Sequence, residues 1–367
     1  MINVNDLSNA TNYTGISLPF VTVIVPSIFT RKQQLERCIS ALLRSDYSNF
    51  EILVVDNRPT PPTKPPDWVM SSEKIRVLHQ PIPGISAARN LGLAKARGSI
   101  VAFTDDDVVV DAQWLRALVN NFTTRDDIAC VTGLVLPLEL DTVAQYWFEE
   151  YFGGFNRGTE TKLYIPIHPV RQRLLAPSGV HRVLCISLTK SHITELSLYE
   201  AIVRCGAGAN MAFRTGALQD AGGFDLALGT GTITKGGEDL AIFATILSNG
   251  GRIIYDPTAI VYHSHRQSYD ELVNQVNGSG LGLTAMLTSL VHKDVRHLFI
   301  MAERLPSALR SIIKRQFFNN QEGYPRNTTA TKMPPTYPKG LRLHELFGMA
   351  KGPLAYTLSR RTMNHYG

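Results

Sequence analysis

The chain has 367 residues, of which 44% are hydrophobic and 19% are charged, and its formal net charge is +6. This composition suits one large α/β domain with an appendage, or two domains. The mild basic excess fits anionic ligands or an anionic membrane face as well as simple solubility. The sequence has no helix-turn-helix, zinc-finger or RNP-type pattern, so we expect no nucleic-acid partner.

The cysteines and the apolar segments bear on the cellular compartment. Four cysteines lie far apart and form no C-x-x-C pair, which argues against a zinc site and a disulfide framework. The polar N-terminus does not resemble a signal peptide. No run of about 18 apolar residues occurs, so we expect no membrane-spanning helix. These features predict a cytoplasmic protein.

The first hundred residues predict alternating strands and helices. The apolar run at 20–26 predicts a buried strand, 31–43 an amphipathic helix and 51–55 a second strand. Such a β-α-β unit implies parallel strands with a right-handed crossover. A helix at 84–95 and a strand at 99–104 continue the pattern.

The middle of the chain is less regular. From 141 to 198 the periodicity weakens and aromatic residues gather. We interpret this segment as an insertion of short helices that lines a cleft, although a local packing cluster explains it equally well. A helix at 112–122 and a strand at 128–136 precede this segment. After it, regular elements return as strands at 207–214, 252–255 and 259–263, and as helices at 215–221, 238–248, 269–291, 295–318 and 341–350.

Three adjacent carboxylates, Asp105, Asp106 and Asp107, follow the strand at 99–104. Like charges at this spacing repel one another, and a divalent cation would relieve the repulsion. Oxygen ligands suit Mg²⁺ or Mn²⁺. The alternative is a solvated acidic turn that caps the next helix. Because α/β sheets bind ligands at the carboxyl ends of their strands, we expect Pro26 and Asp56 at the same site.

Three further sets of residues could take part in catalysis or binding, and each could instead have a purely structural role. Glu238 and Asp239 follow two glycines at a helix start, where a carboxylate serves as a helix-terminal charge or as a base. His263 and His265 follow a strand and serve as metal ligands or as structural residues. Arg89 lies early in a helix and binds a phosphate or pyrimidine edge, or forms a surface salt bridge.

Taken in order, the segments VTVIVPSIFTR, EILVVDN, GISAARNLGL, IVAFTDDD, GANMAFR, GGFD and GGEDL resemble glycosyltransferase family 2. The resemblance covers residues 20–270. It implies an α/β fold of the GT-A type, with a mainly parallel central sheet flanked by helices. It also implies a nucleotide-diphosphate sugar donor, a divalent metal and inversion at the anomeric carbon.

The resemblance assigns a role to each candidate residue. On the donor side, Pro26 would shape the nucleotide pocket, Asp56 would contact the base or ribose, and Arg89 would lie near the base or phosphates. The other roles are donor or metal contact for Asp105, donor contact for Asp106, metal ligation by Asp107 with His263 or His265, base catalysis by Asp239, and sugar contact by Glu238.

The same resemblance divides the chain into a segment at 1–19, a GT-A catalytic domain at 20–270 with the insertion at 141–198, and a helical C-terminal extension at 271–367. The Q-x-x-R-W motif of processive relatives is missing, so we expect one sugar to be added at a time. The expected acceptor is a glycan or a lipid-linked molecule, as in cell-surface polysaccharide or glycolipid synthesis.

The C-terminal extension is basic as well as apolar. This pattern predicts either peripheral contact with the inner face of the plasma membrane or an ordinary helical cap. The basic residues are Lys293, Arg296, Arg304, Arg310, Lys314 and Arg315.

Other functions compete with this interpretation. A nicotinamide oxidoreductase needs G-x-G-x-x-G after the first strand, where this chain has PSIFTR. A nucleotidyltransferase would want a basic, glycine-rich loop at the same place, and it stays an alternative. A non-catalytic nucleotide-sugar-binding protein is the other.

Overall fold

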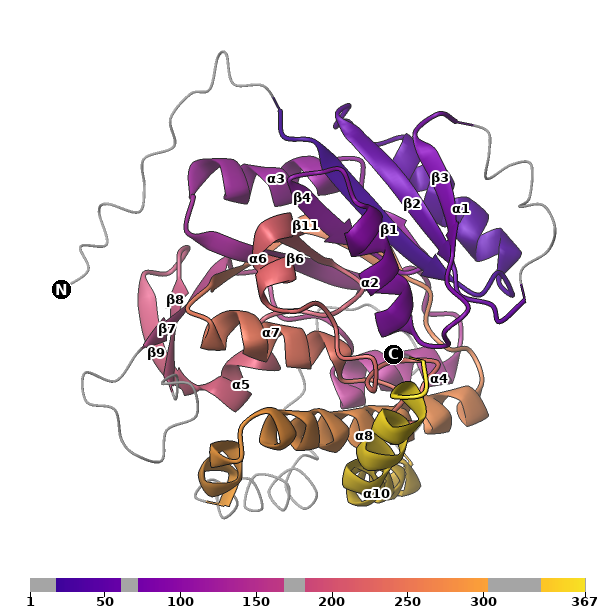
Figure 1. Cartoon of the computed structure of the whole chain (residues 1–367), viewed down its shortest axis with the longest axis vertical. Coiled ribbons are helices and arrows are strands. Elements are labelled where there is room, and N and C mark those ends of the chain that lie inside the picture. Colours follow the sequence, from indigo (N-terminus) through magenta and orange to yellow (C-terminus); the bar gives the residue numbers. More distant parts are fainter. Residues whose placement is uncertain (1–17, 61–71, 168–181, 303–337, 367) are drawn as a thin grey trace, which may run out of the picture.

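The structure is a computed structural model that describes residues 18–60, 72–167, 182–302 and 338–366. A single mixed β-sheet runs through the molecule and carries helices on both faces (Figure 1). Within the described residues the strands follow the order β3-β2-β1-β4-β10-β6-β11-β7-β8-β9, and β5 pairs with β11.

The first half of the sheet is parallel, as the β-α-β pattern predicts. β1 pairs with β2 and β4, and β2 pairs with β3, all in parallel. β1 and β2 are buried along their whole length, because helices cover both faces of the sheet here. The four strands are β1 (Val21–Ser27), β2 (Phe50–Asp56), β3 (Ile75–His79) and β4 (Ile100–Phe103).

The second half makes the sheet mixed rather than mainly parallel. β10 (Met211–Arg214) lies antiparallel between β4 and β6 (Ile128–Pro137). β11 (Arg252–His263) runs parallel to β6 and antiparallel to the short β5 (Val108–Val110). The sequence predicted two strands where β11 is one, because a register shift between Asp256 and Ile260 bends the strand without ending it.

The segment at 141–198 differs from the predicted set of short helices. It begins with α4 (Val143–Trp147) and a turn of π-helix, η2 (Phe148–Phe152). Strands β7 (Lys162–Ile167), β8 (Arg182–Ser187) and β9 (His192–Ser197) then extend the sheet in antiparallel fashion. Their patterns are weak because the first four residues of β9 are exposed at the end of the sheet.

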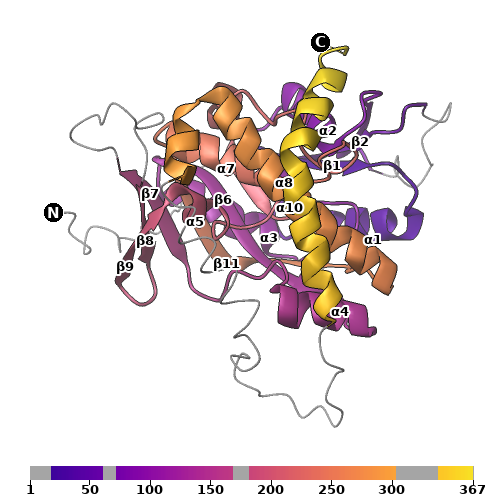
Figure 2. The ribbon, with the colours of Figure 1, turned by 90° about the horizontal axis from the view of Figure 1, so that it is seen from below.

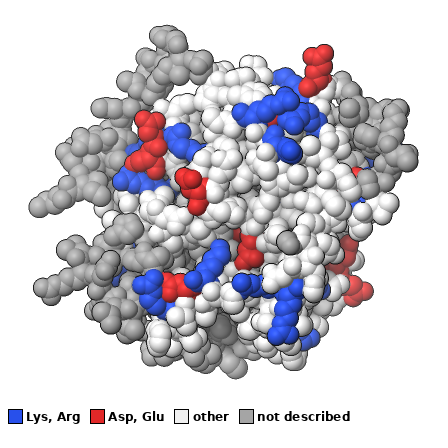
Figure 3. Space-filling model, in the orientation of Figure 1, with Lys and Arg blue, Asp and Glu red and all other residues white. Residues whose placement is uncertain are grey.

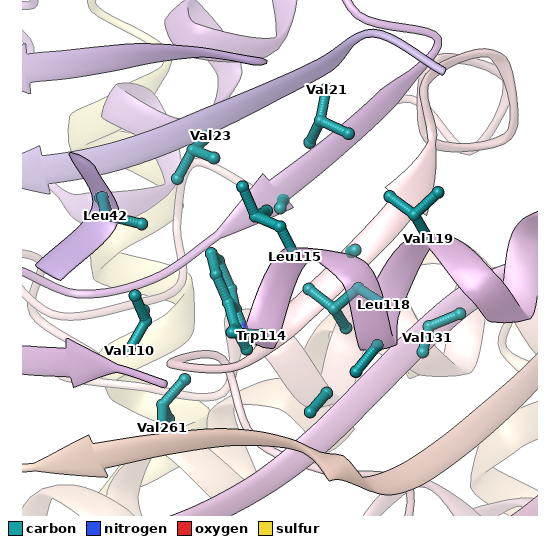
Figure 4. Packing of buried hydrophobic residues seen from close by; sticks show 14 of the residues in the cluster. Val21, Val23, Leu42, Val110, Trp114, Leu115, Leu118, Val119, Val131 and Val261 are labelled. Carbon is teal, nitrogen blue, oxygen red and sulfur yellow. The ribbon is translucent and has the colours of Figure 1, made fainter. Parts of the chain in front are cut away.

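Two hydrophobic clusters lie on opposite faces of the sheet. Val23 and Val25 point into the first, where Trp114 is completely buried (Figure 4). Ile24 points into the second, as strand alternation requires. The first cluster is covered by α1 (Lys32–Leu43) and α3 (Trp114–Thr124). The second is covered by α2 (Ile85–Lys95), α5 (Leu198–Ile202), α6 (Thr215–Asp220) and α7 (Glu238–Ser248).

Two long helices form the described C-terminal part. α8 (Tyr269–Lys293) packs along α10 (Lys339–Met363), which lies over it in Figure 2. Residues 296–302 are helical, and the rest of the helix predicted at 295–318, with Arg304, Arg310, Lys314 and Arg315, lies outside the described residues. None of the helices in the described ranges has the length and hydropathy needed to cross a membrane.

The helix predicted at 341–350 is much longer than expected and continues through Pro353. A proline within a helix leaves the carbonyl four residues earlier without its usual donor. Here the hydroxyl of Thr284 on α8 donates to that carbonyl, Met349 O, at 2.8 Å. Packing against α8 therefore replaces the hydrogen bond that Pro353 removes.

Candidate active site

A cavity of about 660 Å³ opens at the carboxyl ends of β1, β4 and β11, and α7 and α8 close its other side. Of the ten residues with a predicted role, the structure brings eight to its wall. They are Pro26, Arg89, Asp105, Asp106, Asp107, Glu238, Asp239 and His263.

Asp56 and His265 are the two predicted residues that do not line the cavity. Asp56 ends β2, is buried, and accepts hydrogen bonds from Arg58 Nε at 2.8 Å and Nη2 at 2.6 Å. The next residue, Asn57, does line the cavity. Its side chain donates to Gln80 O and accepts from Gly84 N, so it fixes the loop that leads into α2.

Arg89 connects the two acidic groups of the site. Its guanidinium is almost completely buried and donates to Glu238 Oε1 at 2.9 Å and to Asp105 Oδ1 at 3.3 Å. The same group donates to the carbonyl of Gly208. Arg89 therefore belongs to a buried ion-pair network and not to the surface salt bridge that was the alternative from sequence. It holds Asp105 and the start of α7 at one site.

Asp105, Asp107 and His263 form a possible metal site. One ligand atom from each lies within 4.8 Å of the others. Burial alone would raise the pKa of Asp107, but His263, Arg31 and Arg266 outweigh it and lower the pKa. Burial lowers the pKa of His263 against the opposing charge of Asp107, a direction that favours the neutral imidazole that a metal ligand requires.

The hydrogen bonds of His263 determine which nitrogen faces this site. The carboxylate of Glu149 accepts a hydrogen bond from His265 Nε2 at 2.7 Å. With the proton on that nitrogen, the Nδ1 of His265 accepts from Nδ1 of His263 at 3.0 Å. The Nε2 of His263 keeps its lone pair toward Asp107 Oδ1, 3.5 Å away. Two acceptors that face each other at this distance suit a cation between them, so the donor set fits Mn²⁺ or Mg²⁺.

Asp106 has a different environment from its neighbours. It is buried and accepts from Ser27 Oγ and Arg31 Nη2, both at 2.6 Å. Burial raises the pKa of Asp106 to about 6, although the charge of Arg31 opposes the rise. Arg31 also forms an ion pair with Asp107. Asp106 thus anchors Arg31 beside the possible metal site.

Glu238 and Asp239 begin α7, after Gly237. Gly237 has φ of 89°, and a Cβ there would lie 2.4 Å from Gly282 O of α8, so glycine permits this close approach. Asp239 accepts from the backbone N–H of Gly208 at 2.9 Å and of Leu240 at 2.8 Å. Burial, and then the charge of Asp239, raise the pKa of Glu238.

The cavity wall also contains basic residues that the sequence did not single out. Arg31 follows the first strand, Arg157 follows η2, and Arg266 comes directly after the HSH motif. Arg157 Nε is buried without a partner among the described residues, and burial lowers its pKa against the opposing charge of Asp239. The position of Arg266 beside His265 was the one available sequence signal. Arg31 is the N-cap of α1, and Arg157 lies between η2 and β7, outside the helices and strands.

The chain is similar to known glycosyltransferases. Residues 22–192 match the family model described as "Glycosyl transferase family 2". "Pre-mycofactocin glycosyltransferase" of Mycobacterium tuberculosis is 27% identical over 255 residues, which are 69% of this chain and 44% of that protein. "Uncharacterized glycosyltransferase EpsJ" of Bacillus subtilis is 39% identical over 103 residues, 27% of this chain and 29% of that protein. The chain thus spans less than half the length of these two relatives.

A solved structure resembles most of the chain. It is the mannosyltransferase PcManGT from Pyrobaculum calidifontis in complex with GDP-Man and Mn²⁺. The TM-score is 0.53 with 16% identity, and the match covers 92% of this chain and 87% of that one. This likeness confirms the predicted α/β fold of the GT-A type. The family match shows that residues 22–192 belong to glycosyl transferase family 2, and the glycosyltransferase relatives agree with it.

Proposed function

We propose that the chain transfers one sugar from a nucleotide-diphosphate donor to an acceptor hydroxyl, with inversion at the anomeric carbon and with the help of Mn²⁺ or Mg²⁺. One observation carries the proposal. Asp107 of the possible metal site and Asp239 at the start of α7 line the same cavity, and Arg89 joins their neighbours Asp105 and Glu238.

In this reaction Asp239 is the general base. The acceptor oxygen forms a bond to the anomeric carbon, the bond from that carbon to the diphosphate oxygen breaks, and the hydroxyl proton goes to an Asp239 carboxylate oxygen. The N–H groups of Gly208 and Leu240 orient this carboxylate. Each carboxylate oxygen keeps a second lone pair for the proton.

The remaining residues position the donor and its charge. Asp105, Asp107 and His263 would hold the cation, whose bound charge neutralises the leaving diphosphate. Arg31 and Arg266 lie beside the same carboxylates and can contact phosphate oxygens. Pro26 and Asn57 line the wall beside them. We place the nucleotide against these two residues.

The proposal extends to the setting of the enzyme. The acceptor would be a glycan or lipid-linked molecule in cell-surface polysaccharide or glycolipid synthesis, on the cytoplasmic side of the membrane. The four cysteines are free thiols, which is compatible with this location. GDP-mannose is the first donor to test, because the similar mannosyltransferase structure contains it.

Release of free nucleoside diphosphate from a panel of nucleotide sugars, with Mn²⁺ and candidate acceptors, tests the proposal. We expect Asp239→Asn to lower the turnover about 10²–10⁴-fold while donor binding changes little. Asp220→Asn, on the exposed end of α6, is the matched control. Near-normal turnover by Asp239→Asn would remove this residue from the base role. Donor binding without any release would indicate a binding protein. Release of pyrophosphate from a nucleoside triphosphate and a sugar 1-phosphate, in a parallel assay, would indicate a nucleotidyltransferase.

A further inference from the structure

Helix α10 is apolar on two opposite faces. One face packs on α8 with the buried residues Leu341, Ala355 and Tyr356. The opposite face carries four large apolar side chains that are exposed to solvent by 42–65%, which we call the apolar stripe. It consists of Leu343, Phe347, Leu354 and Leu358.

The stripe follows the helix axis. Its members are spaced four, seven and four residues apart, which places them on one side of a helix with 3.6 residues per turn. Figure 2 shows α10 outside α8, so this side faces away from the rest of the protein. A surface helix normally presents polar residues here, and a contiguous apolar surface marks a binding site.

The charges around the stripe indicate what covers it. Lys351 is exposed between Phe347 and Leu354, one helical turn from each, and the exposed Arg361 lies one turn beyond Leu358. In α10, Lys and Arg outnumber acidic residues, with Lys339, Arg342, Lys351, Arg360 and Arg361 against Glu345. A second copy of the chain packed on the stripe would add like charges beside the exposed Lys351 and Arg361. An anionic bilayer complements both the apolar and the basic residues.

A second group of exposed apolar side chains follows the end of α8. Val295, Leu298 and Phe299 are each more than half exposed and directly follow the end of that helix. This end adjoins α10, because the rings of His292 and Tyr356 are 6.4 Å apart. In Figure 3, several Lys and Arg side chains occupy the lower part of the visible face, where Figure 1 places α8 and α10.

We propose that α10 lies on the surface of an anionic lipid bilayer, with the apolar stripe in the interfacial layer and Lys351 and Arg361 at the lipid headgroups. This assignment goes beyond the proposed reaction, because it names a partner surface outside the cavity. It also places the cavity relative to the membrane. α8 contributes Gln275 and Ser279 to the cavity and packs against α10 on another side. Packed helix axes lie about 8–10 Å apart, so the cavity is one helix away from the membrane.

Flotation of the full chain with vesicles tests the proposal. The vesicles contain phosphatidylcholine alone or an equal mixture with phosphatidylglycerol. We expect the wild type to float with the mixed vesicles and Phe347→Glu/Leu354→Glu to stay unbound. Ile193→Glu/Val203→Glu adds the same charges at exposed apolar sites elsewhere and should float like the wild type. Lys351→Gln/Arg361→Gln should bind the mixed vesicles roughly thirtyfold more weakly, at about fivefold per charge.

Three results would overturn the assignment. The first is a wild type that does not float with the mixed vesicles. The second is equal flotation of Phe347→Glu/Leu354→Glu and the wild type. The third is a wild-type dimer in analytical ultracentrifugation that this variant converts to a monomer, which would assign the stripe to a second copy. Release of nucleoside diphosphate with a water-soluble acceptor should be the same in wild type and variant, so this test and that of the enzymatic proposal fail separately.

Discussion

At the scale of single residues, His263 has one ring nitrogen toward Asp107 and the other toward His265. The chain of hydrogen bonds from Glu149 through His265 determines which nitrogen carries the proton. A side chain that orients a metal-binding histidine in this way contributes to metal affinity without touching the metal. His265 is thus a positioning residue.

We predict that His265→Gln weakens Mn²⁺ binding about 10–100-fold, because His263 Nε2 is no longer held as the unprotonated nitrogen. Calorimetry measures the affinity, and ¹⁵N NMR of the ring nitrogens reports the tautomer of His263. His192→Gln, at an exposed position in β9, is the control. An unchanged tautomer together with an unchanged affinity would show that His265 has no such role.

Arg31 occupies carboxylate oxygens that a cation also needs, through its ion pairs with Asp106 and Asp107. We predict that Arg31→Ala strengthens the binding of Mn²⁺ alone by roughly tenfold, since an opposite charge at this distance shifts such equilibria by one to three pK units. Arg116→Ala removes a matched ion pair with Asp46 away from the cavity. Calorimetry without nucleotide makes the comparison, and weaker Mn²⁺ binding by Arg31→Ala would contradict the competition.

The sequence located most of this site because the residues occupy strand ends and a helix start, which are short in sequence and fixed by topology. The partners were not predictable in the same way. Arg31 reaches Asp107 across 76 positions, and Glu149 reaches His265 across 116. Asp56 is the opposite case. Its place in the motif was evident from the sequence, but its carboxylate binds Arg58 and does not line the cavity.

At the scale of elements, the contact between α8 and α10 depends on small residues. A Cβ at Gly348 would lie 2.1 Å from the carbonyl oxygen of Asn277 on α8, and a Cβ at Gly280 would lie 2.2 Å from that of Glu345 on α10. Backbone atoms cannot move aside as a flexible side chain can. The two helices therefore approach as closely as glycine allows.

We predict that Gly348→Ala destabilises the protein by about 1–3 kcal/mol, the usual cost of overpacking. Gly340→Ala in the same helix has no atom within 4 Å of the new Cβ, so it should be neutral or stabilising, by up to about 1 kcal/mol. Urea unfolding of both variants measures the difference. If both substitutions had the same effect, close packing at Gly348 would not be the cause.

The elements that the sequence missed depend on neighbours distant in the chain. β9 has an exposed pattern and is a strand because β8 pairs with it. α10 continues through Pro353 because Thr284 of α8 supplies a donor. In contrast, β1 and β2 were recognisable because a fully buried strand has a continuous apolar run that needs no partner to identify it.

At the scale of the whole molecule, the cavity is lined by residues from many segments between Pro26 and Leu283. Pro26 follows the first strand, Asp107 lies beyond β4, Asp239 begins α7 and Leu283 belongs to α8. A donor and a cation bound there would contact segments that come together only in the folded chain. Because such ligands bind the native state and not the unfolded one, they stabilise the protein as a whole.

We predict that Mn²⁺ and a nucleoside diphosphate together raise the thermal unfolding midpoint more than the sum of their separate effects. At a concentration 100 times the dissociation constant, the stabilisation is about 2.7 kcal/mol. For a chain of 367 residues that corresponds to roughly 3–4 °C. Differential scanning fluorimetry with GDP, UDP and ADP, each with and without Mn²⁺, makes the measurement.

Asp107→Ala should abolish the extra shift, because the cation loses a ligand between His263 and the diphosphate. Asp220→Ala should keep it, since this carboxylate is exposed on α6. A nucleotide shift that is the same with and without Mn²⁺ would separate donor binding from the metal. The carboxylates beyond β4 would then serve to hold Arg31 and Arg89, and the proposed metal dependence would be wrong while the shared cavity remained.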